Sequence, residues 1–239
     1  IGPCGMTVRV AALGGSLLRP EVEDRQAWLR SLSESVMEIN SRGIRLVLVV
    51  GGGAPAREGI ELAKPLIGDD VEALDRIGIA ATRLNARIVS EALESAGIQV
   101  PSKIPESIEI ALSLAATNSV VVMGGTVPGH TTDNVAITMA CNLEAERCII
   151  ATNVSHVHSA DPRTNENAVR FEHLTHDELR EIVGPPVHSS AGGSGVVDPI
   201  GADHARTAGL SLAVLDGRHM ERLHACLCGE SFEGTTIEG

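Results

Sequence analysis

Short runs of Val, Ile, Leu and Ala alternate along this chain with longer segments of helical periodicity. The runs predict strands at Val8 to Leu13, Ile44 to Val50, Val120 to Met123, Arg147 to Thr152 and Leu210 to Leu215. Such alternation is typical of βαβ units, whose strands form a mainly parallel sheet. We therefore expect an α/β fold.

The segments between these strands predict helices. They are Arg25 to Arg42, Pro55 to Leu66, Val71 to Ala96, Glu106 to Ala115, Thr132 to Leu143, Thr175 to Val183 and Pro199 to Ala208. Thr175 stands three residues before Glu178, which is the spacing of a capping box. We also expect a strand at Ile98 to Pro101, and a final helix and strand after Leu215. Because no repeat or long linker is present, one domain over residues 6–239 is the simplest expectation, with residues 1–5 as an extension or tag remnant.

The formal net charge of -12 limits the functions open to the chain. Surfaces for nucleic acid or anionic membranes need clustered Lys and Arg, so neither partner is expected. No stretch approaches the roughly 18 apolar residues of a membrane span, and no signal-peptide pattern opens the chain, which indicates a cytoplasmic protein. The cysteines and histidines lack metal-site spacing, so we expect no metal held by the protein alone.

Three predicted strands run directly into glycine-rich turns. These turns are Gly14-Gly15-Ser16, Gly51-Gly52-Gly53 and Gly124-Gly125-Thr126. Ligands of open α/β sheets bind beyond the carboxyl ends of the strands, where backbone free of side chains can bring several N–H donors onto a phosphate. None of the turns matches GxxxxGK[ST] or GxGxxG. Together they indicate a polyphosphate or two phosphorylated ligands.

Two charged residues follow these turns at positions suited to a nucleotide. Arg57 comes four residues after Gly53, in the first turn of the predicted helix, where its guanidinium could complete a phosphate cradle. Asp75 could accept hydrogen bonds from ribose hydroxyls. Each residue also has a plainer interpretation, a surface arginine and a solvated helix charge, and the residue types alone do not decide between them.

The string MGGTVPGHTTD at 123–133 is highly specific. With LGGSLL at 13–18, VVGGGAPAR at 49–57, DRIGIAATRLNA at 75–86, ATNVSHVHSADPR at 151–163, VVDP at 196–199 and GTTIE at 234–238, it resembles the archaeal type of UMP (uridylate) kinase of the amino-acid kinase superfamily. The resemblance covers essentially the whole chain from Met6. It implies a three-layer αβα sandwich, with the acceptor nucleotide in the half at about 6–145 and ATP in the half at about 146–239.

The resemblance also implies an activity and a set of residues. The activity is transfer of the γ-phosphate of ATP to UMP, giving UDP for pyrimidine nucleotide synthesis, with Mg²⁺ accompanying ATP and a homohexamer as the usual assembly. The matched UMP positions are Gly52, Asp75, Thr126, Val127, Pro128, Gly129, His130, Thr131 and Thr132. The matched ATP positions are Gly14, Gly15, Ser16, Gly53, Arg57, Thr152, Asn153, His158 and Asp161. Arg57 and Asp133 are the candidate catalytic residues.

The chain departs from the family pattern at five positions. Where the family usually reads TNVDGVY, Ser155 replaces an acid, His156 a glycine, and His158 the tyrosine that flanks the ATP base. Ala12 and Asp203 stand where many relatives carry lysine. These changes leave two alternatives to a UMP kinase: a superfamily kinase acting on another small phosphate such as isopentenyl phosphate, and a non-catalytic nucleotide-binding or oxoanion-storage protein.

Overall fold

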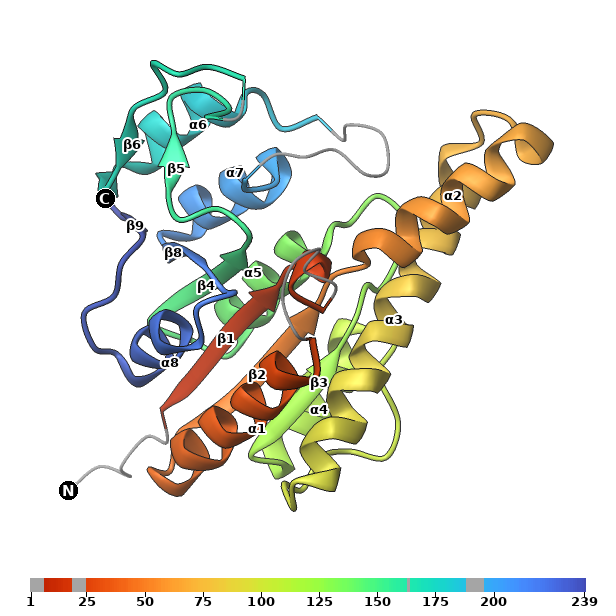
Figure 1. Cartoon of the computed structure of the whole chain (residues 1–239), viewed down its shortest axis with the longest axis vertical. Helices are drawn as coiled ribbons and strands as arrows, with labels where there is room; N and C mark the ends of the chain where they lie inside the picture. Colours follow the sequence, from red (N-terminus) through yellow and green to blue (C-terminus); the bar gives the residue numbers. More distant parts are fainter. Residues whose placement is uncertain (1–6, 19–24, 163, 188–195) are drawn as a thin grey trace.

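The computed structural model describes residues 7–18, 25–162, 164–187 and 196–239. The predicted extension at 1–5, Met6 and Arg163 of the resemblance lie outside the described residues. The described part holds a seven-stranded sheet in the order β3-β2-β1-β4-β8-β9-β7 and a two-stranded sheet of β5 and β6 (Figure 1). The strands are β1 Val8–Leu13, β2 Arg45–Val50, β3 Val120–Met123, β4 Arg147–Thr152, β5 Val157–His158, β6 Arg170–Phe171, β7 His173–Leu174, β8 Ser211–Asp216 and β9 Thr235–Ile237.

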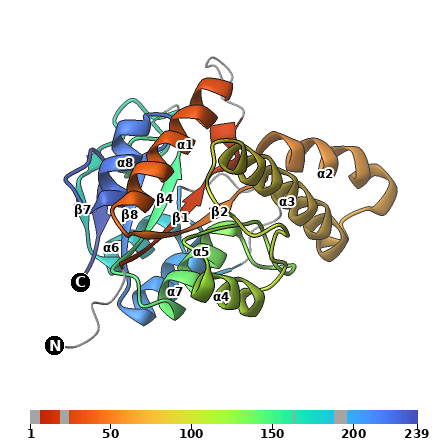
Figure 2. The same ribbon diagram turned by 90° about the horizontal axis from the view of Figure 1, so that it is seen from below.

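Helices cover both faces of the large sheet, which gives three layers (Figure 2). The helices are α1 Arg25–Ser41, α2 Gly53–Ile67, α3 Val71–Ser95, α4 Ile108–Thr117, α5 Thr132–Asn142, α6 His176–Val183, α7 Pro199–Ala208 and α8 Met220–Cys228, with a 3₁₀ turn, η1, at Gly15–Leu18. The expected mainly parallel α/β sandwich is therefore confirmed, because only β9 and β7 break the parallel order. None of the described helices is long and apolar enough to cross a membrane.

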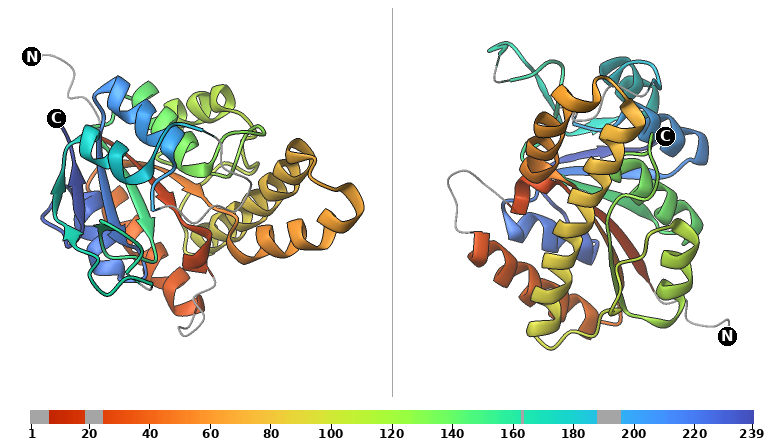
Figure 3. Two further views of the ribbon diagram at one scale, coloured as in Figure 1. Left: turned by 90° about the horizontal axis from the view of Figure 1, so that it is seen from above. Right: turned by 90° about the vertical axis from the view of Figure 1, so that its right-hand side faces the viewer.

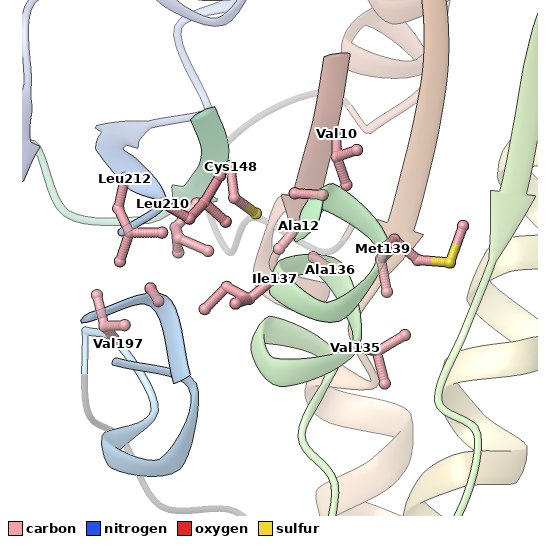
Figure 4. Packing of buried hydrophobic residues seen from close by; sticks show 14 of the residues in the cluster. Val10, Ala12, Val135, Ala136, Ile137, Met139, Cys148, Val197, Leu210 and Leu212 are labelled. Carbon is pink, nitrogen blue, oxygen red and sulfur yellow. The ribbon is translucent and has the colours of Figure 1, made fainter. Parts of the chain in front are cut away.

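Two apolar cores separate the layers. One lies between the sheet and α4, α5 and α7, where Val10 and Ala12 of β1 pack near Ala136 and Ile137 of α5 (Figure 4). The other lies under α1, α3 and α8 and includes Trp28, which is 5% exposed. Strands buried on both faces explain the continuous aliphatic runs of the sequence.

The predicted elements differ from the structure in three places. The strand expected at Ile98 to Pro101 is wrong: the segment is a loop, in which Ile98 packs into the core and donates its N–H to the carbonyl of Leu93, closing the end of α3. The two-residue strands β5, β6 and β7 were not predicted, because so short a run carries no periodicity. The capping box of Thr175 and Glu178, the last helix and the last strand are confirmed.

Helices α2 and α3 form a long hairpin that projects from the body of the molecule (Figures 1 and 3). Several apolar side chains on the projecting part are exposed, with Leu62 at 79% and Leu66 at 86%. Only the later turns of α3 pack on the sheet, where Val89 and Leu93 are fully buried. The hairpin therefore presents one end to the core and the other to solvent.

Candidate active site

The register of β1 brings the glycine turns to one edge of the sheet. Leu13 pairs with Val50 on one side and with Ala151 on the other, so the ends of β2, β1 and β4 lie side by side. A Cβ placed on Gly15 would lie 2.2 Å from the nitrogen of Gly53. The first turn and the start of α2 thus touch backbone to backbone, which only glycine permits.

The turns that follow β2 and β3, residues 51–53 and 124–126, are called the glycine loops below. Gly52 caps α2 without any side-chain hydrogen bond, so the first N–H groups of this helix stay open. Among the described residues, no hydrogen-bond acceptor faces the N–H of Gly52, Gly53, Thr126 or Val127. Unpaired amide donors at a helix start favour an anion.

Arg57 lies in the second turn of α2 rather than the first turn expected from the sequence, because the helix already begins at Gly53. Its side chain is exposed and makes no hydrogen bond or ion pair with the part of the chain that the structure describes. A guanidinium with five unused donors next to open amides suits a phosphate ligand.

The segment from Val127 to Thr132 runs from the second glycine loop into α5. Asp75 of α3 accepts a hydrogen bond from the N–H of Gly129 at 2.7 Å, which fixes the loop against the helix hairpin. A shallow hollow of about 460 Å³ lies at this contact, lined by Val71, Glu72, Asp75, Pro128 and Gly129. The structure thus brings Asp75 to the predicted acceptor loop, although the two are far apart in sequence.

Asp133 stands in the first turn of α5, after the cap residue Thr131, beside the cap of α7. Burial and then the charge of Asp198 raise the pKa of the Asp133 carboxyl to about 6, although the N–H of Asp198, with N···Oδ2 at 3.4 Å, acts in the opposite direction. Burial penalises a charged carboxylate, so part of this acid is protonated near pH 6.

The end of β4 is joined to its neighbours through backbone hydrogen bonds. Gly14 donates to the carbonyl of Ala151, and Gly217 donates to that of Thr152, both at 2.8 Å. The indole Nε1 of Trp28 donates to the carbonyl of Gly217 at 2.8 Å. Ser16 follows in η1. Gly14 to Ser16 and Thr152, which are predicted to bind ATP, therefore come together.

Residues 152–161, called the β4 turn below, are less buried. Asn153 and Asp161 are exposed, while His156 is 2% exposed and its Nδ1 has no partner among the described residues. His158 Nδ1 lies 2.9 Å from the carbonyl of His156, so that nitrogen carries the proton and donates. Burial, and next the charge of Arg170, lower the pKa of the His156 imidazole.

Neither of the two positions where the resemblance leads us to expect lysine holds a cation. Ala12 is 2% exposed within the core beneath α5 (Figure 4). Asp203 on α7 forms ion pairs with Arg206 at 3.1 Å and Arg180 at 3.7 Å. Its negative charge is therefore balanced by arginines of α7 and α6. No group of three or more His, Cys, Asp or Glu that could hold a metal occurs among the described residues.

Sequence reasoning missed three polar residues of α3 that contact the glycine loops. Asn85 Nδ2 donates to the carbonyls of Gly51 and Gly52, at 2.7 and 2.9 Å. Thr82 and Arg83 bind the second loop. The sequence does hold a signal for two of them. Thr82 and Asn85 interrupt the apolar stripe of an amphipathic helix, and a polar side chain on that buried face needs a hydrogen-bond partner.

Comparison with known proteins agrees with this architecture. The model of the amino acid kinase family matches residues 7–216. A uridylate kinase of Methanococcus maripaludis is 38% identical over 228 residues, which cover 95% of this chain and 98% of that protein. The crystal structure of uridylate kinase from Archaeoglobus fulgidus has a TM-score of 0.81 and 37% identity over 97% of this chain and all of that one. A UMP kinase of Bacillus anthracis, at 20% identity and a TM-score of 0.77, shares the fold. The chain belongs to the amino acid kinase family, and within it is similar over nearly its whole length to archaeal uridylate kinases.

Proposed function

We propose that the protein is a UMP kinase, a nucleoside monophosphate kinase that transfers the γ-phosphate of ATP to UMP and gives UDP and ADP. One observation carries this proposal: two glycine loops leave backbone N–H groups without an acceptor among the described residues, and the second loop leads into the segment whose Gly129 binds Asp75 beside a hollow. The full-length similarity to proteins named uridylate kinase supports the choice of UMP. We also propose a cytoplasmic location, where both nucleotides are made and used.

The proposed roles follow the two halves of the chain. Gly52, Asp75 and residues 126–132 hold UMP, with the Asp75 carboxylate on the ribose. Residues 14–16, Gly53, Thr152, Asn153, His158 and Asp161 hold ATP. The acceptor phosphate is already an anionic nucleophile, so transfer needs positioning and charge neutralisation more than a base. Backbone amides and Arg57 supply that neutralisation, and Asp133 lies between the two halves.

We propose that Mg²⁺ arrives with ATP. Mg²⁺ usually keeps several waters and binds through substrate phosphates and one or two carboxylates. The described residues fit this pattern, because the interacting carboxyl groups of Asp133 and Asp198 are present, with one Asp198 oxygen bound to the N–H of Gly201, but no complete metal cage is. The ion would neutralise phosphate charge during transfer.

We further propose a homo-oligomer, with a hexamer as the assembly. Exposed apolar side chains on the adjacent helices α1 and α3 support association: Met37 is 48% exposed, Leu84 52% and Ile88 39%. Burying such side chains against another copy would remove them from water. Light scattering coupled to size-exclusion chromatography gives the assembly directly.

The test is a coupled assay for ADP release with MgATP and, in parallel, UMP, CMP, AMP, isopentenyl phosphate or no acceptor. UMP-dependent turnover supports the proposal. A preference for isopentenyl phosphate would instead show that the protein is a kinase of another small phosphate. Absence of turnover in folded protein that still binds UMP or ATP would establish a binding role instead. Arg57→Gln is the matched variant, expected to keep the fold because the side chain is exposed and to lower UMP turnover.

A further inference from the structure

Helix α3 contacts both glycine loops through side chains on its buried face. Asn85, 2% exposed, donates to two carbonyls of the first loop. Thr82 Oγ1 accepts the N–H of Gly125 at 2.7 Å and donates to the Ile79 carbonyl at 2.6 Å. Arg83 donates to the carbonyls of Gly125 and Thr126, at 3.2 and 3.1 Å. One helix therefore holds two loops that are more than 70 residues apart in sequence.

These bonds determine where the amides of the loops point. In a planar trans peptide, the C=O and the next residue's N–H point in opposite directions. Asn85 draws the carbonyls of Gly51 and Gly52 toward α3, so the N–H groups of Gly52 and Gly53 face away from it. Arg83 does the same for the N–H of Thr126 in the second loop and for the N–H of Val127, the next residue.

All four of these N–H groups lack an acceptor among the described residues. Thr126 is buried, Gly52 and Gly53 are half-buried and Val127 is exposed, so solvent or a ligand can reach most of them. Several unpaired amides that face the same way from neighbouring turns are suited to an anionic ligand. We propose that Asn85 and Arg83 are positioning residues: they orient the amides of Gly52, Thr126 and Val127 onto the phosphate of the acceptor nucleotide, and the amide of Gly53 toward the phosphate transferred from ATP.

This inference rests on the proposed function for the identity of the nucleotide, but it concerns binding and not turnover. The isosteric variant Asn85→Asp tests it, because a carboxylate cannot donate to two carbonyls and repels them. The measurement is the ratio of affinities for UMP and uridine by calorimetry, which isolates the phosphate. We expect the variant to lose about tenfold or more of the preference for UMP, while uridine affinity changes by less than about twofold.

Ser90→Ala is the matched control, since Ser90 is also 2% exposed on α3 and binds neither loop. Its UMP-to-uridine ratio should equal that of the wild type. Arg83→Met provides a second variant whose side chain is part-exposed, so the fold tolerates it more easily, and it should lose the same preference through the other loop. Rescue is expected from Arg83→Lys only in part, because a single ammonium cannot span two carbonyls.

An unchanged ratio in folded Asn85→Asp and Arg83→Met would overturn the inference. So would an equal loss of affinity for UMP and uridine, since that result means general disruption of the site. A wild-type protein that prefers UMP over uridine but does not turn it over contradicts the kinase activity and leaves the ratio test in force. The two failures are therefore distinguishable.

Discussion

The glycine loops and the β4 turn lie at the same edge of the sheet but are constrained to different degrees. Gly124, Gly125 and Thr126 are buried, and α3 side chains hold both loops. In the β4 turn, Asn153 and Asp161 are exposed. Three of the five departures from the family pattern, Ser155, His156 and His158, fall in the β4 turn, whereas the string at 123–133 matches. The loop held by α3 is thus the one that keeps the pattern.

The largest effect is expected where backbone meets backbone. Gly15→Ala places a Cβ 2.2 Å from the nitrogen of Gly53. The turn after β1 and the start of α2 must therefore move apart. We expect UMP turnover to fall by more than about 100-fold, because small displacements of reacting groups are costly, and the free energy of unfolding to fall by about 3 kcal/mol.

The control for this change is Gly78→Ala inside α3, where the nearest atom to the new Cβ is at 3.9 Å. It should raise the free energy of unfolding by about 0.5–1 kcal/mol, because glycine weakens a helix interior. Urea unfolding measures both variants. Equal stability of Gly15→Ala and wild type would show that the close contact is dispensable.

Asp133→Asn should separate stability from activity. A carboxyl whose folded-state pKa of about 6 lies above its unfolded value of 3.8 binds more protons when folded, so wild-type stability falls as pH rises from about 4 to 6. The amide removes this dependence and adds on the order of 2 kcal/mol at neutral pH. Turnover should fall if Asp133 acts in transfer. Unfolding curves at pH 4.5 and 8 are the measurement, and an unchanged pH slope in the variant contradicts the prediction.

In the β4 turn, His156 is expected to make the free energy of unfolding depend on pH in the opposite direction. Its pKa is lowered by burial, so the unfolded chain binds the proton more readily and stability is lost as pH falls below about 6.5. His156→Gln should reduce that acid loss by less than about 1 kcal/mol, since the imidazole is one of several titrating groups. Thermal unfolding at pH 5.5 and 7.5 compares the two proteins. His173→Gln, at an exposed site, is the control.

The smallest effect is expected from His158→Tyr. His158 is only half-buried, and its ring bonds to a carbonyl within the same turn, so the substitution disturbs no distant contact. The KM for ATP should change by no more than about threefold, the equivalent of one weak contact. Steady-state kinetics with saturating UMP provide the number. A tenfold change would mean that the β4 turn is as constrained as the glycine loops.

The sequence predicted the sheet well because the strands are buried on both faces and carry unbroken aliphatic runs. It failed at Ile98, whose apolar character serves a helix end instead of a strand. It also failed for β5 to β7, which are too short to show a pattern. In the site, glycine turns and Asp75 could be found from residue type and resemblance. The carbonyl contacts of Asn85 could not, because they depend on the packing of α3 against two strand ends.

The position of Trp28 has a practical consequence. It is the chain's one tryptophan, and there is no tyrosine, so ultraviolet emission comes from a single buried indole. That indole donates to Gly217, whose N–H in turn donates to Thr152 at the start of the β4 turn. Intrinsic fluorescence therefore reports most directly on the side of the sheet edge where the β4 turn begins. A nucleotide entering beside Thr152 can be followed in real time without an attached dye.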